Sequence, residues 1–429
     1  MRLIPNGVAL ALILLPAFDS QISTCFAQGS LTPPGAPAPT MKTLQQIEPR
    51  TPISSAPVSI LNSGSYYLTD NLDVSFGDAI FISANNVTID LNGFTIRCFD
   101  STNGSVGIRI DTSPFVEFHD ITILNGHLVG YGLIYSGGVY SGSGFGYGIY
   151  SAGAPRNVRI AGVTVSGCLN DGIRLNLNSS SVELCVVTTV GGNGIYAGTV
   201  SKCAAYQCGI NGIFANTVSD SYGSSPSGYG ISAQVANNCY ATSTNGTGMY
   251  IQRTANNCYG ESLNGALSGS GIFTAAANNC YGYAYGSGYG IYAFESANNC
   301  SGISGTSGEG LVAPLAMNCS GYSQSTRGLD ALNAENCYGQ SSSGTGLYAY
   351  CAISCFGYSQ TSYGVDTLRL VSTSYGASNN GIGLRCINGV ATGCYGYSAL
   401  SVGLNAYIAN GCVGDAPTPI SVSYKFNMP

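Results

Sequence analysis

Two carboxylates and a histidine in the first third of the chain have the residue types that acid–base chemistry requires. The alternation of apolar and polar residues around them predicts that Asp90, Glu117 and Arg159 point outward on one face in successive layers. His119 would lie at the next corner of the chain. Because two neighbouring carboxylates can have separated pKa values, they can divide the roles of acid and base in cleaving a bond between sugars. Asp90, Glu117 and His119 are therefore the candidate catalytic residues.

An insertion rich in Gly, Tyr and Ser, residues 130–147, follows these candidates. Loops inserted into a rigid scaffold are where function concentrates. The same residues also fit an ordinary polar surface, and geometry separates the two interpretations. Catalysis requires Asp90, Glu117 and His119 to converge in a groove beneath the insertion, whereas a surface role predicts that they diverge.

Aromatic residues form a second candidate set, suited to binding. They occupy the outward position of a repeated Gly-aliphatic unit, and the six candidate ligand-binding residues are Tyr196, Phe214, Tyr250, Phe273, Tyr292 and Tyr348. Tyrosine combines a flat apolar ring with a polar tip, which suits both sugars and proteins, and an exposed aromatic strip marks a binding surface. Stacking of rings between neighbouring strands is an alternative reason for such a row.

A repeat of fixed length must position these residues. Its pattern is Gly, an aliphatic residue, a variable residue and a small or aliphatic one, at spacings of 18 to 23 residues. The repeated glycines are Gly172, Gly194, Gly212, Gly230, Gly248, Gly271, Gly290, Gly310, Gly328, Gly346, Gly364, Gly383 and Gly403. Such a unit, without helical periodicity, cannot bury its apolar face alone and must stack on its neighbours. The sequence therefore predicts a solenoid.

A second row of residues closes each unit. It contains Cys168, Cys185, Cys203, Ser221, Cys239, Cys258, Cys280, Cys300, Cys319, Cys337, Cys355, Ser374, Cys394 and Cys412. Asn precedes many of these positions and tolerates left-handed backbone geometry, so each coil should turn there. An outward row of aromatic residues follows: Tyr222, Tyr240, Tyr259, Tyr281, Tyr338, Phe356, Tyr375 and Tyr395.

Two interpretations of the cysteines remain open. Cysteines on adjacent coils would lie about 4.8 Å apart, which a disulfide accepts. Alternatively, cysteine acts as a small, soft core residue, which in-register side chains pointing the same way favour. We expect no metal site, because the row is linear and contains no histidine.

One resemblance supports the predicted fold. The stretch GSYYL from Gly64, then NNVTIDLNG from Asn85, followed by repeated Asn-Cys and Gly-Ile units, resembles secreted bacterial right-handed parallel β-helix proteins of the pectin-lyase-like superfamily. The likeness covers residues 58–415. It implies an all-β fold, a single-stranded right-handed parallel β-helix with about 13 regular coils after irregular N-terminal ones.

The resemblance leaves the activity open, because the superfamily contains polysaccharide lyases, hydrolases and adhesins. Pectate lyases would require clustered aspartates that bind calcium and an arginine base. Polygalacturonases would require Asn-Thr-Asp, Gly-Asp-Asp, Gly-His-Gly and Arg-Ile-Lys motifs. None of these motifs occurs in the sequence.

The ends of the chain have a different composition. Arg2, the apolar stretch 8–18 and Cys25-Phe26-Ala27 predict a signal peptide over residues 1–27. Residues 28–57 are rich in proline and predict an extended linker. The β-helix would span 58–415, and 416–429 would form a C-terminal tail or cap. No later segment is apolar enough to cross a bilayer.

Composition limits the partners. With 14 Lys and Arg and a net charge of −6, the chain has no basic patch for nucleic acid. The leading hypothesis is an exported, non-catalytic protein, structural, adhesive or carbohydrate-binding, without a cofactor. It would be secreted or held at the cell surface, and its partners would be polysaccharide, other surface components or further copies of itself. A polysaccharide lyase or glycoside hydrolase is the alternative.

Signal cleavage is testable directly. We expect the exported protein to begin near Gln28, because the small-x-small site ends at Ala27. N-terminal sequencing of protein recovered outside the cytoplasm checks this expectation. An N terminus at Met1 in that fraction would contradict it.

Overall fold

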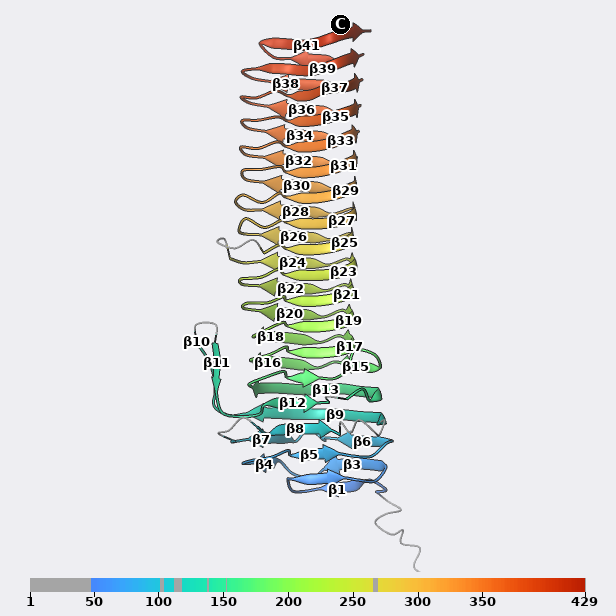
Figure 1. Cartoon of the computed structure of the whole chain (residues 1–429), viewed down its shortest axis with the longest axis vertical. Coiled ribbons are helices and arrows are strands. Elements are labelled where there is room, and N and C mark those ends of the chain that lie inside the picture. Colours follow the sequence, from blue (N-terminus) through green and yellow to red (C-terminus); the bar gives the residue numbers. More distant parts are fainter. Residues whose placement is uncertain are drawn as a thin grey trace, which may run out of the picture. The chain divides into compact units, whose positions relative to one another are not determined.

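The computed structural model describes residues 48–100, 104–111, 118–136, 139–151, 153–264 and 269–428. Residues Arg50–Pro429 form one compact unit, in which 39 strands belong to one continuous sheet (Figure 1). The fold is the predicted single-stranded right-handed parallel β-helix, with about 19 turns. The predicted signal peptide lies outside the described residues.

The first coils are irregular. Their strands are β1 (Thr51–Ile53), β2 (Val58–Ile60), β3 (Gly64–Leu68), β4 (Leu72–Val74), β5 (Ile80–Ile82), β6 (Val87–Asp90), β7 (Thr95–Cys98), β8 (Val106–Ile110), β9 (His119–Gly130), β12 (Tyr147–Tyr150), β13 (Arg156–Cys168), β14 (Ile173–Arg174), β15 (Ser180–Glu183) and β16 (Val186–Val190). An antiparallel hairpin of β10 (Leu133–Ser136) and β11 (Val139–Gly142) lies within the predicted insertion and stands off the column (Figure 1).

Long and short strands alternate from β17 onward. The long strands are β17 (Ile195–Ser201), β19 (Ile213–Ser219), β21 (Ile231–Asn237), β23 (Met249–Asn256), β25 (Ile272–Asn278), β27 (Ile291–Asn298), β29 (Leu311–Met317), β31 (Leu329–Glu335), β33 (Leu347–Ile353), β35 (Val365–Ser372), β37 (Leu384–Thr392), β39 (Val402–Asn410) and β41 (Thr418–Phe426). The short strands are β18 (Ala204–Cys208), β20 (Tyr222–Ser225), β22 (Tyr240–Ser243), β24 (Tyr259–Ser262), β26 (Tyr281–Ala284), β28 (Ser301–Ser304), β30 (Ser320–Ser323), β32 (Tyr338–Ser341), β34 (Phe356–Ser359), β36 (Tyr375–Ser378), β38 (Tyr395–Ser398) and β40 (Val413–Asp415). Each pairs in parallel with the equivalent strand of the next coil.

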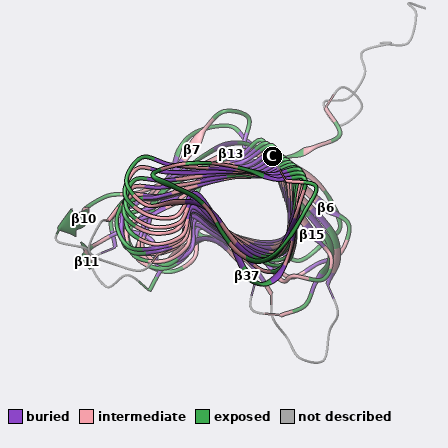
Figure 2. Ribbon diagram, turned by 90° about the horizontal axis from the view of Figure 1, so that it is seen from above, coloured by how far each residue is buried: buried purple, intermediate pink, exposed green. Residues whose placement is uncertain are grey.

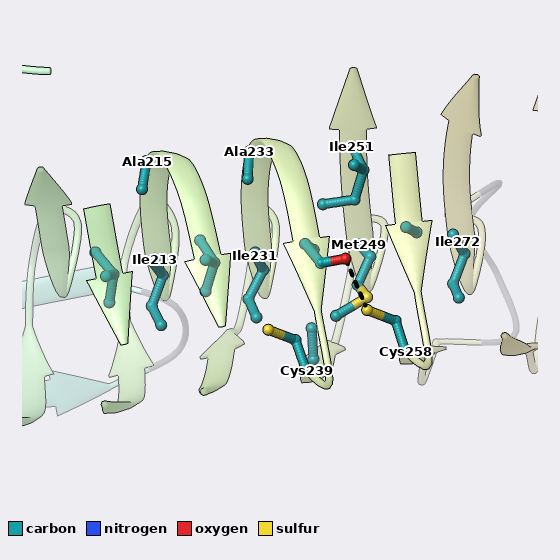
Figure 3. Packing of buried hydrophobic residues seen from close by; sticks show 14 of the residues in the cluster. Ile213, Ala215, Ile231, Ala233, Cys239, Met249, Ile251, Cys258 and Ile272 are labelled. Atoms are coloured by element: carbon teal, nitrogen blue, oxygen red, sulfur yellow. Dashed lines mark hydrogen bonds between the residues drawn. The ribbon is translucent and has the colours of Figure 1, made fainter. Parts of the chain in front are cut away.

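Side-chain alternation forms the core as predicted. In one coil, Ile291, Ala293 and Ala297 are buried, and Cys300 is 3% exposed. Viewed end-on, the buried segments of successive coils superimpose (Figure 2). Equivalent side chains therefore form rows along the rod, such as Ile213, Ile231, Met249 and Ile272 (Figure 3).

The glycine of the repeat is required by close packing. A Cβ added at Gly290 would lie 2.1 Å from the backbone nitrogen of Ile303 and 2.4 Å from the carbonyl oxygen of Gly310. Backbone from the short strand and from the next coil therefore fills the space that a side chain would need. This contact explains why glycine precedes the aliphatic residue in every regular unit.

Asparagine turns the chain between the long and short strands. Six equivalent residues have φ between 52° and 54°: Asn238, Asn257, Asn279, Asn299, Asn318 and Asn336. Asn adopts this left-handed geometry more readily than other non-glycine residues. Their side chains also form a ladder, in which the Nδ2 of Asn257 donates to Oδ1 of Asn238 at 3.1 Å, and that of Asn279 donates to Oδ1 of Asn257 at 3.2 Å.

The cysteine row satisfies backbone groups at the same corner. The Sγ of Cys280 donates to the carbonyl oxygen of Asn278 at 3.2 Å, and its amide donates to Sγ of Cys300 at 3.4 Å. Ser374 stands in the same row, and its Oγ accepts from the amide of Cys355 at 3.0 Å. The row thus requires a small side chain that both donates and accepts. The sixteen described cysteines carry free thiols in the structure.

Two strands lie outside the predicted limits of the β-helix. β1 falls in the segment predicted as linker, yet it pairs in parallel with β3, Thr51 beside Tyr66. β41 falls in the segment predicted as a C-terminal tail or cap, and it pairs in parallel with β39, Leu404 beside Ile420. Pro52 lies within β1, in the proline-rich segment. Parallel pairing therefore continues on both sides of residues 58–415.

The corner ladder gives a stability prediction. Asn257→Ala should lower the free energy of unfolding by about 1–3 kcal/mol, because it places alanine at φ 52° and removes two side-chain hydrogen bonds. Asn257→Gly should cost less, because glycine accepts this backbone geometry. Guanidinium unfolding measures both. Gly393→Asn is the control for placing an asparagine at left-handed backbone geometry. Gly393 has φ 60°, and an added Cβ would meet its nearest atom at 3.9 Å. Equal losses for Ala and Gly at position 257 would contradict the backbone explanation.

Counting reactive thiols tests whether the cysteines of the row are free or joined in disulfides. Burial raises the pKa of the Cys168 and Cys208 thiols, and Cys351 is the one described cysteine that is not fully buried. We expect a thiol reagent to modify little except Cys351 in the native protein, and all sixteen after denaturation without reductant. Four of the sixteen lie outside the row, so more than four missing thiols after denaturation would show that disulfides join cysteines of the row.

Candidate functional site

Asp90, at the end of β6, stabilises a turn at one corner of the early coils. Its carboxylate accepts from the backbone nitrogen of Asn92 at 2.9 Å and from Nδ2 of Asn125 at 3.3 Å. It also forms an ion pair with Arg50 at 3.3 Å. Asn92 and Asn125 both have left-handed backbone geometry. The contacts of Asp90 thus stabilise the turn in two successive coils.

His119 lies at a different corner, at the start of β9. Its Nδ1 is 2.7 Å from Oδ2 of Asp120, and both side chains are exposed. The pKa of the Asp120 carboxyl is lowered, chiefly because Nδ2 of Asn157 donates to it and also because of His119. In the pairing of β6 with β9, Asp90 lies beside Leu124, five residues after His119. The structure therefore does not bring Asp90 and His119 together.

The predicted column of charged residues in these coils is wrong. Arg159 lies beside Thr122 and Thr122 beside Thr88, whereas Asp90 continues through Leu124 to Ala161. Asp90 and Arg159 are thus two positions out of register. Arg159 pairs instead with Glu183 in the next coil. Glu117 lies outside the described residues.

The first aromatic row is a stack of rings. Tyr196 and Phe214 stack with centroids 5.0 Å apart and an interplanar angle of 3°, and Phe273 lies 5.3 Å from Tyr250 and 5.2 Å from Tyr292. Because the planes are nearly parallel, each ring covers the face of its neighbour. Tyr348, the sixth member, is covered by the guanidinium of Arg327 at 3.9 Å. The faces of most rings in this row are therefore already occupied.

The second aromatic row forms two stacks on the short strands. Neighbouring centroids in the first stack are 4.8 to 5.3 Å apart. Its members are Tyr206, Tyr222, Tyr240, Tyr259 and Tyr281. The second stack has spacings of 5.0 to 5.2 Å. Its members are Tyr338, Phe356, Tyr375 and Tyr395.

A groove of about 650 Å³ runs between the first of these stacks and the asparagine ladder. Its lining repeats the same residue types in successive coils: Asp220, Ser221, Asn238, Cys239, Tyr240, Asn257, Cys258, Tyr259, Asn279 and Tyr281. Tyr240 is 39% exposed, and its hydroxyl donates to Oε2 of Glu261 at 3.1 Å. Burial, and then this hydrogen bond, raise the pKa of the Tyr240 hydroxyl. The groove thus presents amides and neutral phenols, with the carboxylate of Asp220 beside Asn238.

The sequence predicts the tyrosines of this groove as an outward row but does not predict the groove itself. It predicts the asparagines as corner residues and the candidate binding row on the long strands. The available signal was the tetrad Asn-Asn-Cys-Tyr, which recurs at 237–240, 256–259 and 278–281. It places an exposed amide and an outward ring on the two sides of one corner in three coils, with the ring exposed at Tyr240 and half-buried at Tyr259 and Tyr281.

No group of three or more His, Cys, Asp or Glu side chains within the described ranges could hold a metal ion. The same part of the chain contains no helix long and apolar enough to cross a membrane.

Comparisons with known proteins give only distant similarities. No protein-family model matches the sequence, and no curated protein matches it. Among solved structures, the chain is similar to the enzymatically active domain of a bacteriophage tailspike protein, at 13% identity and a TM-score of 0.29. That similarity covers 70% of this chain and 42% of the tailspike domain, so the chain spans less than half of that domain.

Two further structures cover more of their own length. The A-module of a mannuronan C-5 epimerase from Azotobacter vinelandii is 11% identical with a TM-score of 0.25, over 85% of this chain and 89% of that one. PfbA, a surface adhesin of Streptococcus pneumoniae, is 10% identical with a TM-score of 0.15, over 86% and 83% of the two chains. Similarities of this size carry no conclusion about the activity or ligand of this protein.

Proposed function

We propose that this protein is an exported, non-catalytic β-helix that binds a linear polysaccharide along the groove between the asparagine ladder and the tyrosine stack. The observation that carries the proposal is the repetition of Asn and Tyr along this groove in three successive coils. It would act as a structural or adhesive element, secreted or at the cell surface.

The periodicity of the groove favours a polymer over a single small molecule. Tyr240, Tyr259 and Tyr281 repeat at 4.8 to 5.0 Å, and the amides of Asn238, Asn257 and Asn279 repeat with them. A chain of identical sugars offers hydroxyls at a regular interval and can repeat one contact in every coil. Weak contacts add up when they are made by one linked ligand.

The stacking of the rings defines the mode of binding. Tyr240 is tilted by 52° to Tyr259, and Tyr259 stacks on Tyr281 at 14°, so the groove presents ring edges, phenolic hydroxyls and amide groups. These groups donate and accept hydrogen bonds, and the charged residue in the lining is Asp220. Neutral polysaccharides therefore fit the groove better than polyanionic ones.

The positions of Asp90 and His119, the two described catalytic candidates, favour a non-catalytic role. Asp90 and His119 lie at different corners, and Asp90 is engaged by Asn92, Asn125 and Arg50. Those contacts account for the conformation of Asp90 without a substrate. Turnover of a polysaccharide that Asp90→Ala abolishes, in a variant that remains folded, would overturn the non-catalytic part of the proposal.

Hydroxyl removal tests the groove. The triple variant Tyr240→Phe, Tyr259→Phe and Tyr281→Phe keeps the stacked rings and deletes three polar tips, and should weaken binding of a neutral polysaccharide at least about tenfold. Affinity electrophoresis or calorimetry of the mature protein with a panel of neutral and acidic polysaccharides measures this loss.

A matched control lies on the same face. Tyr338→Phe, Tyr375→Phe and Tyr395→Phe remove three hydroxyls from the second stack, outside the groove, and should leave polysaccharide affinity unchanged. Equal losses in both triple variants would move binding away from the groove. No binding by the wild-type protein to any member of the panel would leave only a structural rod.

A further inference from the structure

Both aromatic rows are interrupted between β27 and β33. On the short strands, Ser301 and Ser320 stand between the Tyr281 and Tyr338 positions. The Oγ of Ser320 donates to Oγ of Ser301 at 2.9 Å. The strands β28 to β31 thus carry no ring at the row positions, whereas the strands that flank them do.

The interruption on the long strands leaves a pocket. In that row Val312 and Asp330 occupy the two positions between Tyr292 and Tyr348. A pocket of about 220 Å³ opens there, lined by Tyr292, Ala293, Phe294, Val312, Ala313, Pro314, Asp330, Ala331 and Leu332. An apolar cavity of about 150 Å³ accepts benzene, so this space holds one six-membered ring.

The walls of the pocket are apolar and exposed. Phe294 is 45% exposed and Leu332 is 58% exposed. Tyr292 stacks on Phe273, and the ring of Tyr289 lies 5.0 Å from it at an angle of 51°. In the next coil the row continues with the small Val312, and both Tyr292 and Val312 line the pocket.

The charge beside the pocket is negative. Arg327 forms ion pairs with both Asp330, which lines the pocket, and Glu309, at 3.7 Å from Oε1. One guanidinium therefore faces two carboxylates. Burial raises the pKa of both carboxyls, and the nearby Asp330 raises that of Glu309 further, so the excess negative charge is present only at a pH where both carboxyls have lost their protons. Arg327 is also held over the ring of Tyr348, away from the Tyr292 side.

We infer that this pocket binds the six-membered ring of an amino sugar, with its protonated amine between the Tyr292 ring and the Asp330 carboxylate. A cation within about 6 Å of an aromatic face is attracted to it, and the excess carboxylate supplies charge complementarity. The apolar side of the sugar ring would lie against Val312 and Phe294. The site goes beyond the polysaccharide groove, shares none of its lining residues, and stands or fails independently.

Three monosaccharides isolate the contribution of the amine. Glucosamine should bind the mature protein about tenfold more tightly than glucose or N-acetylglucosamine, because both neutral sugars lack the cation. Ligand-observed NMR titration, at a pH where the amine of glucosamine is protonated, measures the three affinities. Equal affinities, or no binding of glucosamine, would overturn the inference.

Two variants test the location of the site. Val312→Tyr places a ring in the interrupted row, fills the pocket and should abolish binding of glucosamine. Glu309→Gln removes the excess charge, keeps the Asp330–Arg327 pair and should reduce the preference for glucosamine over glucose to about twofold or less. Asn405→Tyr, which adds a ring at a distant position of the same row, is the control and should leave binding unchanged.

The proposals for the groove and for the pocket can be contradicted separately. Val312→Tyr should leave binding of the polymer in the groove intact, and the triple Tyr→Phe variant of the groove should leave binding of glucosamine intact. Thermal unfolding confirms that each variant is folded. Binding of glucosamine that survives Val312→Tyr in a folded variant would place the amine elsewhere and overturn the inference.

Discussion

The rest of this structure depends on the in-register parallel pairing of each coil with the next. Ile291 lies beside Leu311, and Leu311 beside Leu329, so one residue type at one position becomes a row along the rod. A slip by one residue would turn every buried side chain of a coil outward. Identical neighbours in register also favour amide ladders and stacked rings, which supply further stabilisation at the surface.

This register explains features that would otherwise look unrelated. The repeated glycine makes room for the backbone of the neighbouring segments, the asparagine supplies left-handed geometry, and the cysteine or serine bonds the corner amide of the coil before it. The aromatic rows follow from the same rule. They also determine which groups are free to bind, because a stacked ring offers its edge and its hydroxyl rather than its face. Binding of a ring face is then confined to the coils where the stack is interrupted.

The regular coils could be predicted from the sequence because each local signal agrees with its neighbours. Ile291, Ala293, Ala297 and Cys300 face inward as the alternation requires, and Asn299 turns the chain. The early coils could not be aligned in the same way. Left-handed corners at Asp120 and Asn125 divide β9, so the alternation does not carry from Asp90 to Arg159. The groove was missed because it combines a corner residue with an outward residue from the following strand, and neither alone indicates a concave surface.

The central claim is that the register of the coils presents one repeating contact to a linear polysaccharide. The most direct measurement is a crystal structure of the mature protein with a bound oligosaccharide from the most tightly bound polymer. The account predicts an oligosaccharide that lies along the rod axis, with equivalent contacts to Asn238, Asn257 and Asn279 and to the hydroxyls of Tyr240, Tyr259 and Tyr281. An oligosaccharide that crosses the rod, or that binds beside Asp90 and His119, would contradict it.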